Sequence, residues 1–93
     1  MRLKKWEIDI IKNSAKEVFG DEVIVKLFGS RVDDNKKGGD IDLYVITKNN
    51  SFENQRKFWS LLQIKLGEQK IDIIYNENSN RDIEKIANQG IIL

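Results

Sequence analysis

The sequence predicts a small α/β protein of the α+β kind, in which a mixed β-sheet of about three strands is covered by helices on one face. Three segments show apolar residues at helical spacing. Three shorter segments are rich in β-branched and aromatic residues, and the two kinds of segment mostly alternate along the chain. With 93 residues, the chain is expected to form one domain, residues 1–93.

The predicted helices cover residues 3–19, 51–66 and 81–89. In the first, the apolar residues recur at helical spacing and the charged residues lie mostly opposite, so this helix is expected to cover a sheet. Ser51 and Asn80 are suited to cap the second and third helices at their N-termini. A glycine follows each helix and favours its termination.

The predicted strands cover residues 23–28, 40–46 and 70–75. Their Ile, Val, Leu and aromatic residues are typical of short buried strands. Residues 29–39 are expected to form a loop between the first two strands. The apolar residues 91–93 are expected either to fold over the core or to be presented to another chain.

The composition excludes several kinds of chemistry. Without cysteine there is no disulfide or thiolate site, and without histidine the usual zinc sites and Ser-His triads are excluded. Carboxylates remain the strongest candidates for metal ligation and proton transfer. The net charge of +1 argues against a large basic surface for binding nucleic acid. No apolar run approaches the ~18 residues of a membrane span. A cytoplasmic protein that binds neither membrane nor nucleic acid directly is expected.

Two aspartates open the second predicted strand. Since alternate strand residues share a face, Asp40 and Asp42 are expected to lie on one face, about 7 Å apart. Asp72 joins them if both strands cover the same core. Three carboxylates there would suit Mg²⁺, with a nucleoside triphosphate as substrate. Alone, an Asp-x-Asp pair also fits a solvated strand face, and Asp72 a surface position. Tyr44 shares this face and fits either a nucleotide contact or packing.

Gly29 and Ser30 close the first predicted strand. Alone, this pair also fits a simple strand-to-turn connection. Glycine, however, lets the backbone approach a phosphate closely, and the Ser30 hydroxyl and nearby N–H groups would favour an anion. Arg31 fits either an ordinary loop charge or a residue that reaches a triphosphate. The loop does not fit a calcium-binding loop, because Tyr44 stands where a bidentate Glu is required.

In this order, the motifs resemble the nucleotidyltransferase superfamily of DNA polymerase beta. Gly29 and Ser30 are followed after nine residues by Asp-x-Asp, and a further Asp stands in a later strand. The run LFGSRVDDNKKGGDIDLYV and the short length are similar to the minimal nucleotidyltransferases (MNT). These are small prokaryotic proteins often encoded beside a helical HEPN partner, and the resemblance includes the antitoxin type of such HEPN/MNT systems.

The resemblance implies a polymerase beta-type fold and an enzyme that transfers a nucleotidyl group. The three aspartates would be the catalytic and metal-binding residues and would hold two Mg²⁺ ions, with Asp72 completing the second metal site. Gly29, Ser30 and Arg31 would bind the nucleotide. The resemblance further implies that ATP donates AMP to a tyrosine of a HEPN-type toxin, which would make the protein an antitoxin and a protein adenylyltransferase.

Two other functions stay open. The protein could be a binding module that neutralises a partner by contact alone, or a transferase for a small-molecule hydroxyl. The presence of all three carboxylates and of the Gly-Ser pair favours an enzyme over a binding module. Because no acceptor-binding domain is predicted, a partner protein is expected to supply the acceptor or to be it. Homo-oligomerisation is left open.

Overall fold

The computed structural model describes residues 3–29, 40–67, 69–77 and 82–93. In chain order, its elements are α1 (Lys5–Phe19), β1 (Ile24–Phe28), β2 (Ile41–Ile46), α2 (Phe52–Leu66), β3 (Ile71–Tyr75), α3 (Asp82–Asn88) and β4 (Ile91–Ile92). Each predicted helix and strand is present, with bounds shifted by at most two residues. The predicted α+β class is therefore confirmed.

The sheet contains four strands in the order β3-β2-β1-β4. β1 is antiparallel to both β2 and β4, whereas β2 and β3 are parallel and are connected through α2. β4 was not predicted. Its Ile91 and Ile92 pair with β1, and the N–H of Leu93 donates to the carbonyl of Val25 at 2.9 Å. Of the two outcomes expected for residues 91–93, the structure shows attachment to the chain's own sheet.

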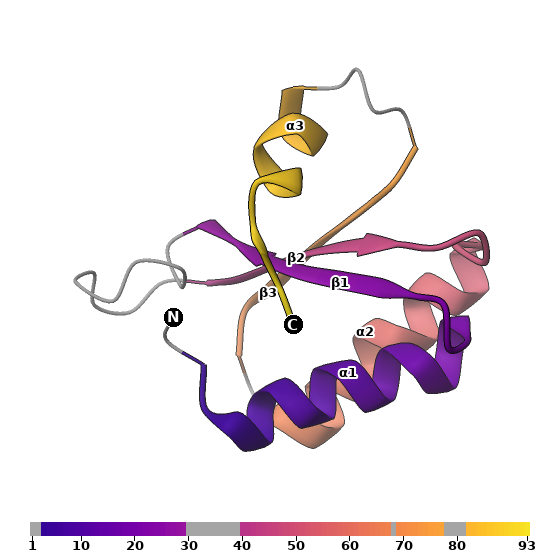
Figure 1. Cartoon of the computed structure of the whole chain (residues 1–93). Helices are drawn as coiled ribbons and strands as arrows, with labels where there is room; N and C mark the ends of the chain where they lie inside the picture. Colours follow the sequence, from indigo (N-terminus) through magenta and orange to yellow (C-terminus); the bar gives the residue numbers. More distant parts are fainter. Residues whose placement is uncertain (1–2, 30–39, 68, 78–81) are drawn as a thin grey trace.

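Helices lie on both faces of the sheet (Figure 1). α1 and α2 cover one face, as expected, and enclose the main core. The fully buried large side chains of this core include Ile11, Leu27, Leu43, Phe58 and Leu62. α3 lies on the opposite face, where Ala87 packs with Phe28 and Tyr44 in a smaller cluster. The sequence pattern placed the helices on a single face, and the position of α3 corrects that expectation.

The helix ends have identifiable causes. Ser51 caps α2 as predicted, since its hydroxyl accepts a hydrogen bond from the N–H of Asn54 at 3.2 Å. α1 begins at Lys5, and the Glu7 carboxylate accepts the N–H of Lys4 at 2.9 Å. Asn80, the predicted cap of the third helix, lies outside the described residues. None of the helices in the described ranges is long and apolar enough to cross a membrane.

Candidate active site

The parallel pairing of β2 with β3 brings two of the predicted aspartates together. Asp42 and Asp72 are register partners, and so are their neighbours Ile41 and Ile71. Ile41 and Leu43 are fully buried in the core beneath the sheet. Since successive strand residues point to opposite faces, Asp42 and Asp72 lie on the face away from α1 and α2. They share a face, as the alternation in the sequence predicted, and the strand register makes them direct cross-strand neighbours.

Asp40, the third predicted carboxylate, stands just before β2 and contacts a lysine. Lys70 Nζ lies 3.3 Å from Asp40 Oδ2, and the two side chains are 73% and 39% exposed. Backbone pairing fixes this approach, because the N–H of Ile41 donates to the carbonyl of Lys70 at 3.1 Å. Lys70 was not predicted as a site residue. Its position two residues before Asp72, and hence on the same face, is the sequence signal for it.

Neighbouring charges perturb the ionisation of Asp42. Burial, then the negative charge of Asp72 and then that of Asp40 raise the pKa of Asp42, and the Lys70 ammonium opposes this rise. The hydrogen bond from Lys70 to Asp40, together with the charges of the aspartates, raises the pKa of Lys70. The ionised form of Asp42 is therefore disfavoured, and added positive charge beside it would stabilise that form.

Gly29 lies against Asp42 at the end of β1. Its φ of 76° is in the left-handed region that favours glycine. A Cβ added there would collide with Oδ2 of Asp42 and would lie 3.0 Å from its Cγ. The backbone conformation therefore favours glycine, and any Cβ would force the Asp42 side chain to move. Ser30 and Arg31, the other predicted nucleotide-binding residues, lie outside the described residues.

α3 covers the neighbouring part of the carboxylate face. The Tyr44 hydroxyl, two residues along β2 from Asp42, donates to Glu84 Oε1 at 3.0 Å. Glu84 is buried and also accepts the N–H of Glu77 at 3.1 Å. Lys26 Nζ donates to the side chain of Asn88 at 2.7 Å and to its carbonyl at 3.0 Å. Of the two roles expected for Tyr44, the structure shows packing, here against α3. α3 therefore borders the site.

The donor set has the chemistry that Mg²⁺ prefers, since it consists of carboxylate oxygens. Asp42 and Asp72 repel each other, and the backbone of Gly29 approaches the Asp42 carboxylate so closely that a Cβ would collide with it. Within the described ranges, no three carboxylate, His or Cys side chains lie close enough together to hold a metal ion. The arrangement thus offers an adjacent pair of carboxylates, while Asp40 is engaged by Lys70.

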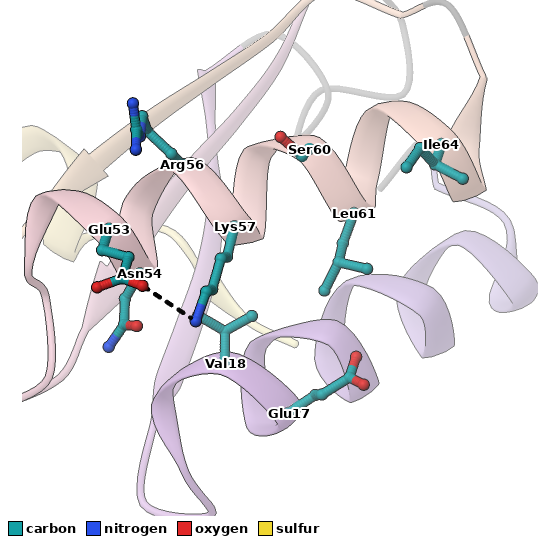
Figure 2. Close-up of a pocket in the computed structure, with 9 residues that line it drawn as sticks. All are labelled: Glu17, Val18, Glu53, Asn54, Arg56, Lys57, Ser60, Leu61 and Ile64. Carbon is teal, nitrogen blue, oxygen red and sulfur yellow. Dashed lines mark ion pairs between the residues drawn. The ribbon is translucent and has the colours of Figure 1, made fainter.

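A hollow in the described part of the chain lies elsewhere. It has a volume of about 810 Å³ and lies between α1 and α2. Figure 2 shows residues that line it, among them Val18, Leu61 and Ile64. An ion pair between Lys57 Nζ and Glu53 Oε1, 3.5 Å apart, lies beside it. These helices cover the sheet face opposite Asp42 and Asp72. Two carboxylates line this hollow, but Glu17 and Glu53 come from different helices and Glu53 is paired with Lys57. The register pair of Asp42 and Asp72 therefore makes the sheet face the candidate active site.

Comparison with protein families finds a match over most of the chain. The family described as "Polymerase beta, Nucleotidyltransferase" matches residues 9–93. The matched range includes Gly29 and all three predicted aspartates. A comparison with curated proteins finds no match.

Proposed function

Since the chain belongs to the polymerase beta nucleotidyltransferase family, we propose that it transfers AMP from ATP to a hydroxyl group of a partner protein. Transfer of a nucleotidyl group is the general chemistry of the family. The observation that carries the proposal is the register pairing of Asp42 with Asp72 beside the backbone of Gly29. It brings paired carboxylates next to a backbone segment that a phosphate can approach closely.

In this proposal the three aspartates hold Mg²⁺, with two ions bound in the loaded enzyme. Asp42 and Asp72 supply oxygens from adjacent strands, and Asp40 joins them from the start of β2. Bound Mg²⁺ would neutralise the triphosphate charge and make the acceptor hydroxyl a better nucleophile. The raised pKa of Asp42 supports this role, because its ionised form needs compensation by nearby positive charge.

The nucleotide is held next to these carboxylates. Gly29 would let the triphosphate approach the backbone, and the sequence neighbours Ser30 and Arg31 would supply a hydroxyl and a positive charge for its oxygens. The acceptor oxygen attacks the α-phosphorus of ATP and forms a new P–O bond. The bond from the α-phosphorus to the bridging oxygen of the β-phosphate breaks, so that pyrophosphate leaves. Asp72, exposed at the sheet edge, accepts the proton of the hydroxyl.

The proposed acceptor is a tyrosine of a helical HEPN-type toxin, whose RNA substrate the added AMP would exclude. The protein would then act as an antitoxin. Exposed apolar side chains support a protein partner, since Phe52 is 85% and Ile64 79% exposed on α2. Ile64 also lines the hollow between α1 and α2, where Val18 and Leu61 add further apolar surface.

Intact-mass spectrometry of the partner tests this proposal. After incubation of the complex with ATP and Mg²⁺, the partner should gain the mass of one AMP unit, or of several. The Asp40→Ala variant should add none. An unmodified partner that wild type and Asp40→Ala inhibit equally at stoichiometric ratio would contradict transfer. It would establish a binding module instead.

A further inference from the structure

We propose that Lys70 is a positioning residue that engages Asp40 and competes with a divalent cation for it, so that the three-carboxylate site is complete only after Lys70 is displaced. This inference rests on the proposed function, because it concerns the same carboxylates. It assigns a role to a residue outside the predicted site. Its central observation is the distance of 3.3 Å between Lys70 Nζ and Asp40 Oδ2.

The backbone makes this contact a property of the fold. β2 and β3 are parallel with Ile41 opposite Ile71, so the residues just before them, Asp40 and Lys70, are also opposite each other. The carbonyl of Lys70 accepts the N–H of Ile41 at 3.1 Å. Lys70 therefore reaches the same face as Asp72, its neighbour two residues along the chain. The strand register therefore places Lys70 beside the aspartates.

Lys70 and a divalent cation would compete for the negative charge of Asp40. Its ammonium lies against Asp40 and acts electrostatically on Asp42 and Asp72 as well. A cation held by these carboxylates would be repelled by the ammonium, and both would be drawn to the Asp40 carboxylate, whose Oδ2 faces Lys70. Asp40 is thus occupied while Asp42 and Asp72 stay adjacent, which agrees with the lack of a three-residue metal cluster in the described ranges.

The ion pair between Lys70 and Asp40 can also be broken easily, so that each side chain can take another partner. Lys70 and Asp40 are both solvent-exposed to a substantial degree, and an exposed ion pair is weak and easily broken. A triphosphate brings several negative charges that offer Lys70 another partner. Metal alone then binds weakly, because it must displace Lys70, whereas metal with a triphosphate binds more tightly. Lys70 makes occupation of the site depend on the nucleotide.

Titration of the full chain with Mn²⁺, followed by electron paramagnetic resonance without nucleotide, tests this role. Lys70→Gln should bind Mn²⁺ about three- to ten-fold more tightly than wild type, because the competing charge is gone. Lys70→Arg, which keeps the charge, should stay close to wild type. An affinity of Lys70→Gln equal to that of wild type would overturn the proposal.

Lys57→Gln is the matched control. It removes the same charge from another exposed ion pair, with Glu53, on the opposite side of the sheet. Equal tightening in Lys57→Gln and Lys70→Gln would show a general charge effect and reject the role of Lys70. In an Asp40→Asn background, the change at Lys70 should lose its effect; an undiminished effect would also reject the role.

The failure of this inference can be told apart from failure of the proposed function. If Asp42→Asn weakens Mn²⁺ binding but Lys70→Gln does not tighten it, the metal site stands and only the competition by Lys70 is rejected. If Asp42→Asn leaves Mn²⁺ binding unchanged, the carboxylates do not form the metal site. Both proposals would then be rejected together.

Discussion

Asp42 and Asp72 occupy the same register position on the parallel strands β2 and β3, and the charge of Asp72 adds to burial in raising the pKa of Asp42. Neighbouring carboxylates of this kind oppose folding when both are ionised. In the proposed nucleotidyl transfer, a bound cation would offset this repulsion. The same repulsion makes the pair testable by stability measurements as well as by activity.

Asp42→Asn is expected to stabilise the metal-free protein at pH 7. Because the folded pKa of Asp42 is raised above 3.8, the folded state holds its proton more tightly than the unfolded state. Stability is therefore lost as pH rises from near 3.8 through the folded pKa. The midpoint of thermal unfolding should rise by about 1–3 °C at pH 7, a small effect because the group is partly exposed. A gain of the same size at pH 3 would contradict this cause.

Asp72→Asn is expected to separate nucleotide binding from transfer. Triphosphate binding should persist because Asp40, Asp42 and the Gly-Ser segment remain. The rate of transfer should fall by about a hundred-fold or more, since Asp72 is assigned to the acceptor-side metal and to the proton. Calorimetric titration with ATP and a transfer assay measure the two effects. Proportional losses of affinity and rate would remove the special role of Asp72.

Gly29→Ala is expected to destabilise the protein by about 1–2 kcal/mol through its left-handed backbone alone. A further loss should come from the collision of the new Cβ with the Asp42 carboxylate. Urea unfolding of the two single variants and of Gly29→Ala/Asp42→Ala separates these contributions. Gly29→Ala should cost less in the Asp42→Ala background; an equal cost in both would show that the contact with Asp42 is unimportant.

Tyr44→Phe is expected to loosen α3, because it removes the donor of a buried hydrogen bond to Glu84. Such a loss costs about 1–2 kcal/mol. Amide exchange in α3 should accelerate more than in α1, which packs on the other face of the sheet. Equal acceleration in both helices would indicate general destabilisation rather than undocking of α3.

Local patterns were sufficient to predict every element except β4, and the face that Asp42 and Asp72 share. Helical spacing predicted α1 and α2, the cap at Ser51 marked the start of α2, and strand alternation placed Asp42 and Asp72 on one face. β4 has only two residues, too few for a period to be visible. The face covered by α3 depends on tertiary packing.

The contact between Lys70 and Asp40 depends on the register of two strands separated in sequence by a helix. No local pattern specifies such a register, because it arises when α2 packs and β3 joins the sheet. The close approach of Gly29 to Asp42 likewise depends on how β1 meets β2. The Gly-Ser pair indicated a turn but not the carboxylate that its backbone would meet.

The most direct test of nucleotidyl transfer follows radioactive phosphate in ATP. With Mg²⁺ and the partner protein, label in the α-phosphate should become covalently attached to the partner, and label in the γ-phosphate should leave as pyrophosphate. Asp42→Asn should abolish attachment of the α-label. Transfer of the γ-label, or undiminished attachment of the α-label with Asp42→Asn, would contradict the account.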